Sequence, residues 1–258
     1  VQAALRETQN VASNRNLEWW SRGQAMLADF IRNESRPGRL IEARLEALAG
    51  QKAYPNSVGA KMCAVILHEI ERPDYRMQAM ISDNLNRPSI EVTYRNINKM
   101  FFRAYSVDLE GSLKDMKSGR DLFSSENAVS LIRENTKKPV AEWSVDLSPT
   151  PDFSFHKKFV TPPLKKMGPY LIVSSGRADF SGNNDTVHFT RFLATDLVLL
   201  IGKQGAGSVE TQVIFGESGL PASGVEVSLY RSQWDKRAEL VETKKTQQNG
   251  FVSFKESF

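Results

Sequence analysis

The apolar residues of this 258-residue chain change their spacing at Pro73. Before Pro73 they recur every three to four positions, as on one face of a helix, and after it they alternate with polar residues, as along a half-buried strand. Because proline lacks the backbone N–H that a helix needs, it also ends the helix before it. The change predicts a mixed fold, in which an α-helical region over residues 1–72 precedes β-structure.

Three amphipathic helices are predicted in this first region. They are expected over residues 16–33, 39–50 and 55–72. Gly50 is a natural stop for the second helix, and either Asn56 or Ser57 is the expected N-cap of the third. The side chains expected to be buried or to share an apolar face are Trp19, Trp20, Leu27, Phe30 and Ile31, then Leu40, Ile41, Leu45 and Leu48, then Met62, Val65, Ile66 and Ile70.

Seven short alternating segments after Pro73 predict an antiparallel β-sandwich over residues 73–194. The expected strands lie within residues 77–81, 90–94, 99–108, 140–147, 153–160, 168–175 and 186–194. A polar insertion at 109–139 interrupts the series, and one short helix is expected in it around residues 126–135. Turn residues such as those of "SPTPD" and "SGNND" separate the later strands.

A second alternating pattern over residues 195–258 predicts another sandwich that is incomplete, because only five strands fit. Its first segment, "TDLVLLIG", is expected to be a buried strand, since it is far shorter than the ~20 apolar residues needed to span a bilayer. Gly216, Gly219 and Gly224 suit the positive φ of a turn, and Asn249-Gly250 predicts a β-hairpin. The predicted fold class is thus mixed, with an α-helical region followed by tandem antiparallel β-sandwiches, the second incomplete.

The charge of the chain argues against nucleic acid as a partner. The 34 basic and 30 acidic residues give a net charge of +4, which divides into +2, +3 and −1 over residues 1–72, 73–194 and 195–258. No segment concentrates the basic field that nucleic-acid binding needs. The densest basic stretch, "FHKKFVTPPLKK", is interpreted as a solvated strand and loop.

The reactive residues are few and scattered. The three histidines, His68, His156 and His188, fall in three different expected elements, and "HEIER" has Arg72 where a zinc-protease helix needs its second histidine. Cys63 is the one cysteine, so it can form no internal disulfide, and its apolar helix favours a buried free thiol.

The remaining candidate motifs have structural explanations. "GKQGAGS" carries glycine and lysine in the wrong order for a phosphate loop and is interpreted as a hairpin connection. The oxygen-rich stretch of Asp179, Asn183, Asn184 and Asp185 fits no calcium-loop spacing and favours an Asx-rich turn. The pairs Trp19-Trp20 and Phe101-Phe102 are expected to pack in cores or between domains rather than to bind sugars. The prediction is therefore no catalytic residue, no cofactor, no metal ligand and no enzyme.

Five segments in order resemble the N-terminal part of bacterial alpha-2-macroglobulin-like proteins, particularly long forms from the Bacteroides group. They are "YPNSVGAKMC", "RPSIEVTYRNINKMFFRAYSVD", "GPYLIVSSGRADFS", "TRFLATDLVLL" and "GESGLPASGVEVSLYR". The resemblance covers about residues 54–258, and its last two segments look like the start of the second macroglobulin domain. It implies that both sandwiches are of macroglobulin, fibronectin-III-like type.

The resemblance implies a non-catalytic scaffold fragment of an envelope protein that traps peptidases by enclosing them after cleavage of a bait segment. Its thioester motif, Cys-Xaa-Glu-Gln, does not carry over to Cys63, which "AVI" follows. The implied partners are peptidases, held by parts of the parent outside this fragment, and neighbouring domains of the same chain. The chain begins at Val1 without a signal peptide, so it is expected to be an excised piece, anchored to a membrane only through an absent N-terminal segment.

Two other classes stay open. A surface scaffold or adhesin would use the same sandwiches, and "SGLPASGVEV" with "QNGFVSF" also looks like transthyretin-like binding modules of envelope proteins. An enzyme is the weakest alternative, because no nucleophile lies beside a base.

Overall fold

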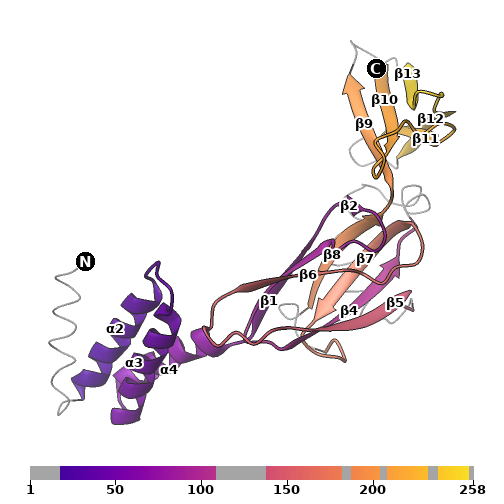
Figure 1. The fold of residues 1–258 in the computed structure, drawn as a ribbon. Helices are drawn as coiled ribbons and strands as arrows, with labels where there is room; N and C mark the ends of the chain where they lie inside the picture. The colour runs from indigo at the N-terminus through magenta and orange to yellow at the C-terminus, as the bar shows by residue number, and fades with distance from the viewer. Residues whose placement is uncertain (1–17, 109–137, 182–186, 204–207, 232–237, 256–258) are drawn as a thin grey trace. The chain divides into compact units, whose positions relative to one another are not determined.

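The computed structural model describes residues 18–108, 138–181, 187–203, 208–231 and 238–255. Three helices precede a set of antiparallel sheets, as the expected fold class requires (Figure 1). The chain divides into two compact units. The first comprises Val1–Arg76, Thr93–Asn98 and Leu147–Lys158, and the second comprises Met77–Val92, Lys99–Asp146 and Phe159–Phe258.

The three helices of the first unit begin and end close to their expected bounds. They are α2 (Trp19–Arg32), α3 (Arg39–Ala53) and α4 (Val58–Glu71). Ser57, rather than Asn56, is the N-cap of α4, and its hydroxyl accepts a hydrogen bond from Ala60 N at 3.0 Å. The helix ends at Glu71, two residues before Pro73, as the loss of a backbone donor demands.

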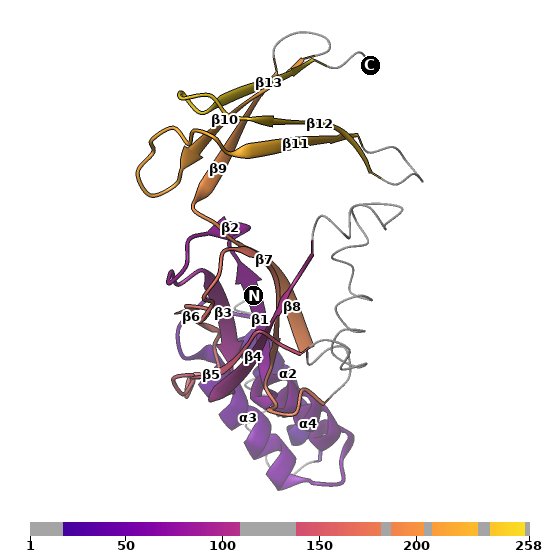
Figure 2. The same cartoon turned by 90° about the vertical axis from the view of Figure 1, so that its right-hand side faces the viewer.

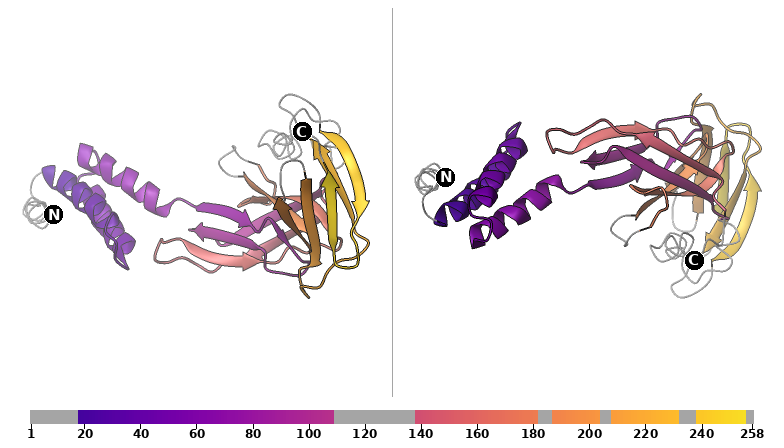
Figure 3. Two further views of the ribbon diagram at one scale, coloured as in Figure 1. Left: turned by 90° about the horizontal axis from the view of Figure 1, so that it is seen from above. Right: turned by 90° about the horizontal axis from the view of Figure 1, so that it is seen from below.

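Small residues, rather than the largest apolar ones, form much of the contact between these helices, which pack side by side in Figure 3. The expected apolar face of α3 is wrong in part, because Ile41 and Leu45 are exposed while Ala43 and Ala47 are buried. Gly50 does not end α3 but lies inside it, buried against α2 and α4. The backbones approach so closely that only small side chains fit between them.

Several other residues that were expected in the helical core lie at the surface. Trp19, Met62 and Val65 are exposed, whereas Trp20, Leu27 and Ile31 are buried as predicted. The helical core consists of Ala25, Leu27, Ala28, Ile31, Ala43, Ala47, Cys63, Ile66, Leu67 and Ile70. Leu40, Leu48 and Phe153 pack against its edge.

The next eight strands form two sheets. They are β1 (Asp74–Ala79), β2 (Ser82–Asp83), β3 (Ile90–Arg95), β4 (Lys99–Ser106), β5 (Ala141–Asp146), β6 (His156–Val160), β7 (Gly168–Ser175) and β8 (Val187–Ala194). One sheet has the order β1-β3-β6, and the other has the order β2-β8-β7-β4-β5. The seven predicted strands are all present, and the short β2 was not predicted. Ile81, expected inside the first strand, is instead exposed just after it.

Alternation along the central strands separates the two faces of the five-stranded sheet. Met100, Phe102 and Ala104 of β4 are buried on one face, where the Phe102 ring stacks on Trp143 with centroids 5.1 Å apart. On the other face, Tyr105 pairs with Leu171, and these residues cluster with Val173 and Phe180. Both faces of β7 are therefore buried, which explains its nearly continuous apolar sequence.

Five strands follow in the C-terminal part of the second unit (Figure 2). They are β9 (Leu197–Lys203), β10 (Ser208–Phe215), β11 (Glu226–Arg231), β12 (Glu239–Lys245) and β13 (Phe251–Lys255). One sheet has the order β13-β10-β9, and the other is the pair β11-β12. Gly219 and Gly224 have φ of 69° and 74°, as the turn prediction requires, whereas Gly216 does not have a positive φ.

Two expectations for this region are wrong. Asn249-Gly250 does not join a hairpin, because β12 pairs with β11 whereas β13 pairs with β10, so the turn carries the chain from one sheet to the other. β9 is not buried: it lies at the edge of its sheet, and all five residues from Leu197 to Ile201 are exposed. An edge strand has a neighbour on one side only, so apolar sequence alone does not bury it.

The expected helix at 126–135, with most of its insertion, lies outside the described residues. The domain bounds at residues 72 and 194 stay predictions.

Candidate binding site

A cleft of about 370 Å³ lies in the first unit where several chain segments meet. Its lining comes from the C-terminal ends of α2 and α4, the first residues of α3, the end of β3 and the loop before β6. The cleft is basic, because four of its lining residues are arginines, namely Arg32, Arg39, Arg72 and Arg95.

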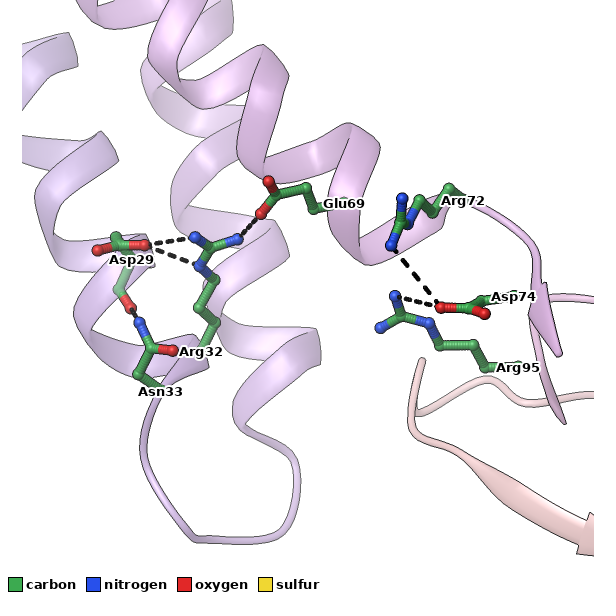
Figure 4. A network of polar contacts seen from close by, with 7 residues as sticks. All are labelled: Asp29, Arg32, Asn33, Glu69, Arg72, Asp74 and Arg95. Carbon is green, nitrogen blue, oxygen red and sulfur yellow. Dashed lines mark hydrogen bonds and ion pairs between the residues drawn. The ribbon is translucent and has the colours of Figure 1, made fainter. Parts of the chain in front are cut away.

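Arg32 joins α2 to α4 on one side of this cleft (Figure 4). Its guanidinium pairs with Asp29 at 2.7 Å and with Glu69 of α4, while Asn33 Nδ2 donates to the carbonyl oxygen of Asp29 at 2.7 Å. The hydrogen bond and the positive charge of Arg32 lower the pKa of Glu69. Partial burial opposes the charge of Arg32, but its two carboxylate partners outweigh burial and raise its pKa.

Arg72 and Arg95 share a single carboxylate on the other side. Asp74 Oδ2 lies 3.8 Å from Arg72 and 3.5 Å from Arg95, so both contacts are longer than a good hydrogen bond (Figure 4). The Arg95 guanidinium lies 4.7 Å from the centroid of the Phe155 ring, which fixes its plane by a cation–π contact. Its Nε is buried, and no described residue accepts a hydrogen bond from it.

Asn96 fastens the end of α4 beside the cleft. Its Nδ2 donates to the carbonyl oxygens of Ile70 (2.7 Å) and Arg72 (3.1 Å), which end a helix and have no partner within it. Its own backbone N–H donates to Thr150 Oγ1 at 2.8 Å. Asn96 has φ of 54°, a conformation that asparagine tolerates better than most residues.

Phe153 adds an apolar contact with the helices to the hydrogen bonds that Asn96 makes. It lies in the loop before β6, has φ of 57°, and packs against the helical core. The Arg44 guanidinium lies 5.3 Å from the centroid of its ring. The cleft is therefore framed by segments that are each held in place.

The histidines do not come together. His68 lies exposed on α4, His156 lies on β6, and His188 lies on β8. His156 Nε2 is 2.8 Å from Asp152 Oδ1 in the loop before β6. Burial opposes ionisation of Asp152, but this hydrogen bond, the charge of His156 and backbone donors together lower its pKa. Across the described parts of the chain, no three His, Cys, Asp or Glu side chains group as metal ligands do.

Cys63 is a buried thiol, as its position in the sequence predicted. Its Sγ lies 3.6 Å from the carbonyl oxygen of Ser21, inside the helical core. Burial disfavours the thiolate and raises the pKa of Cys63 to about 11. Burial therefore favours the Cys63 thiol over the thiolate, which is the nucleophilic form.

Asp179 forms a local turn. Its carboxylate accepts hydrogen bonds from the hydroxyl (2.6 Å) and the backbone N–H (3.0 Å) of Ser181, and these lower its pKa to about 2. This agrees with the predicted Asx-rich turn. The other three residues of that motif, Asn183, Asn184 and Asp185, lie outside the described residues.

A second polar cluster, in the second unit, fixes the start of β9. Asp196 accepts hydrogen bonds from Gly216 N at its carbonyl oxygen (2.5 Å) and from Glu217 N at its carboxylate (3.0 Å). Asn84 Nδ2 donates to the same carboxylate at 3.4 Å, and Arg87 pairs with Glu217 at 3.9 Å. These contacts connect the loop after β2 to the turn after β10.

No short motif in the sequence contains the arginine cluster. Arg32 and Arg39 are close in sequence, but Arg72 and Arg95 follow more than thirty and more than fifty positions after Arg39. The four residues come from α2, α3, the residue after α4, and β3. A local signal exists only for Arg32 and Asp29, which are three residues apart on one helix face.

No protein-family model matches the chain, and no curated protein matches it. Solved structures do. A fragment of Escherichia coli alpha-2-macroglobulin spanning domains NIE-MG1 matches with a TM-score of 0.53 and 15% identity, over 72% of this chain and 88% of that one. A longer fragment spanning MG0-NIE-MG1 matches with a TM-score of 0.50 and 16% identity, and this chain covers 58% of its length.

A Salmonella alpha-2-macroglobulin structure also aligns, with a TM-score of 0.46 and 18% identity, over 72% of this chain and 10% of that one.

The class that the fold defines is therefore a helical region followed by β-sandwich, macroglobulin-like domains. Its structural neighbours are domains of bacterial alpha-2-macroglobulins, at low sequence identity. They give no support to the narrower resemblance to Bacteroides proteins. Within the described residues, no helix is long and apolar enough to cross a membrane.

Proposed function

We propose that this chain is a non-catalytic scaffold segment of an alpha-2-macroglobulin-like peptidase inhibitor that works in the bacterial cell envelope. The observation that carries the proposal is the fold likeness to Escherichia coli alpha-2-macroglobulin, which extends over 88% of the NIE-MG1 fragment. The Bacteroides-type affiliation and the periplasmic or outer-membrane location belong to this proposal. So do its partners, which are peptidases and neighbouring domains of the parent protein.

The contacts within the chain suit such a scaffold. A trap needs modules that stay folded while one segment elsewhere is cut, and packed sheets with fixed connections meet that need. Asn96 fixes the end of α4, and Asp196 fixes the turn after β10, each through several hydrogen bonds. Irregular segments held in this way open rarely, so a peptidase seldom finds them accessible.

The test uses the full-length protein that contains this chain. It is incubated with a broad-specificity peptidase, and the complex is assayed on a small peptide and on a large protein substrate. Enclosure predicts that cleavage of the small substrate continues while cleavage of the large one stops. The 258-residue chain alone serves as the matched control, and we expect it to leave both activities unchanged. Equal activity on both substrates after incubation with the full-length protein contradicts the proposal.

A surface scaffold or adhesin is the second candidate, and one observation favours it. The exposed apolar edge strand β9 offers unpaired backbone groups to an extended partner strand. A full-length protein that fails the two-substrate assay but binds a cell surface through this region would support it instead.

A further inference from the structure

We propose that the arginine-lined cleft at the end of α4 binds a carboxylate presented by an acidic peptide segment. The cleft is the one described above, in the first unit, with a volume of about 370 Å³. This inference does not depend on the proposed function.

The first argument is the local balance of charge. Arg32, Arg72 and Arg95 pair with the three carboxylates of Asp29, Glu69 and Asp74, and Arg39 adds a fourth positive charge to the lining of the cleft. These seven groups together leave one positive charge unbalanced. Arg32 uses two of those carboxylates, so Asp74 alone serves both Arg72 and Arg95. Arg39 donates its Nε to a backbone carbonyl oxygen, that of Arg32, at 2.9 Å. One further carboxylate would restore neutrality.

The second argument is the state of Arg95. Its side chain is only 15% exposed, and its buried Nε has no acceptor among the described residues. A buried donor without an acceptor is unfavourable, so the contacts within the described chain leave Arg95 incompletely satisfied. The Phe155 ring holds the guanidinium plane, so little further ordering is needed when a ligand arrives.

The third argument concerns the kind of anion. Arginine presents donors in a planar fork that matches both oxygens of a carboxylate. A single unbalanced charge suits a monoanion better than a phosphate dianion, and the chain lacks the basic field that nucleic acid requires. Leu40, Phe153 and Phe155 give the cleft apolar walls, which can contact the methylene groups and flanking side chains of a peptide. A glutamate or aspartate next to an apolar residue therefore fits best.

The test measures fluorescence anisotropy of a fluorescein-labelled peptide, acetyl-Gly-Phe-Glu-Leu-Gly-amide, titrated with the 258-residue chain at low ionic strength. Its matched control replaces the glutamate with glutamine. We expect binding of the glutamate peptide, a loss of roughly tenfold or more in affinity for the glutamine peptide, and weakening by added salt. Equal affinity for both peptides overturns the proposal.

Two variants locate the binding. Arg95→Met and Arg39→Met each remove one charge from the cleft, and we expect each to weaken binding roughly tenfold. Arg76→Met is the matched control, because Arg76 also approaches the Phe155 ring, at 5.8 Å, but does not line the cleft. If Arg95→Met disturbs folding, Arg39→Met carries the test. Equal loss in Arg76→Met and Arg39→Met overturns the proposed location.

A competition experiment distinguishes a carboxylate carried by a peptide from a free small-molecule carboxylate. Acetate and N-acetylglutamate amide are added against the labelled peptide. We expect them to displace it only at far higher concentration than the unlabelled peptide does. If they compete as well as the unlabelled peptide, the peptide half of the proposal is wrong.

Discussion

Gly50 of α3 lies against Cys63 of α4 so closely that a Cβ atom on Gly50 would be 2.7 Å from Cys63 Sγ. The same Cβ would be 2.8 Å from Gln24 Cβ on α2. Ser21 reinforces this three-helix contact by donating its hydroxyl to the carbonyl oxygen of Gly50 at 2.7 Å. The glycine is therefore required by the space between the helices rather than by a turn.

Gly50→Ala is expected to destabilise the chain by about 1–3 kcal/mol, because overpacking outweighs the better helix propensity of alanine, which is about 1 kcal/mol. The measurement is the free energy of unfolding in urea. Ala49→Ser, at an exposed site on the same helix, is the control and should change stability by about 0.5 kcal/mol or less. A variant Gly50→Ala as stable as the parent chain would contradict the packing argument.

Asn96→Ala is expected to destabilise the chain by about 1–3 kcal/mol, because the carbonyl oxygens of Ile70 and Arg72 lose their donor. The positive φ of 54° at Asn96 also contributes to this destabilisation, because alanine is strained in that conformation whereas glycine adopts it freely. Asn96→Gly separates the two contributions, and we expect it to be less damaging than Asn96→Ala. Equal stability of all three proteins would show that the amide does not hold the end of α4.

Cys63 is expected to resist thiol reagents in the folded chain at pH 8, since burial raises its pKa to about 11. The raised pKa also makes stability depend on pH. The folded state favours the neutral thiol, so this contribution is complete below the ordinary pKa of 9.0 and declines as pH rises toward about 11. The measurement is the rate of reaction with a chromogenic disulfide reagent, with and without denaturant. The same rate in both conditions would contradict the buried position.

The exposed β9 edge is expected to make the 258-residue chain associate with itself at high concentration, as an unpaired apolar strand does. Ile201→Lys places a charge on this edge at a residue that is 68% exposed, so it should reduce association without loss of stability. Leu220→Lys, at a similarly exposed loop residue of the same unit, is the control. The measurement is sedimentation velocity over a concentration series, which reports how much the chain associates with itself. Unchanged association in Ile201→Lys would exclude this edge.

Local patterns in the sequence were sufficient for the order and type of the elements. The helical spacing before Pro73 and the alternation after it predicted three helices followed by antiparallel strands, and Ser57 was among the expected caps. Such patterns succeed because helix and strand periods, caps and turn glycines depend on residues only a few positions apart.

The absence of an obvious catalytic motif could also be read from the sequence, but the arginine-lined cleft could not. Arg32, Arg72 and Arg95 come from α2, the residue after α4, and β3, and only the fold brings them to one cleft. The attachment of Asn96 to the end of α4 is likewise a contact between residues more than twenty positions apart.

The sequence by itself thus determined the type and order of the three helices and of most strands, because hydrogen bonding and side-chain period are local. Only the tertiary structure decided that Ala43 and Ala47 face the helical core instead of Ile41 and Leu45, that β13 pairs with β10 rather than with β12, and that β9 is an exposed edge. Those outcomes depend on how closely distant backbones approach and on which strand edges remain unpaired. Both are properties of long-range packing, which no short stretch of sequence contains.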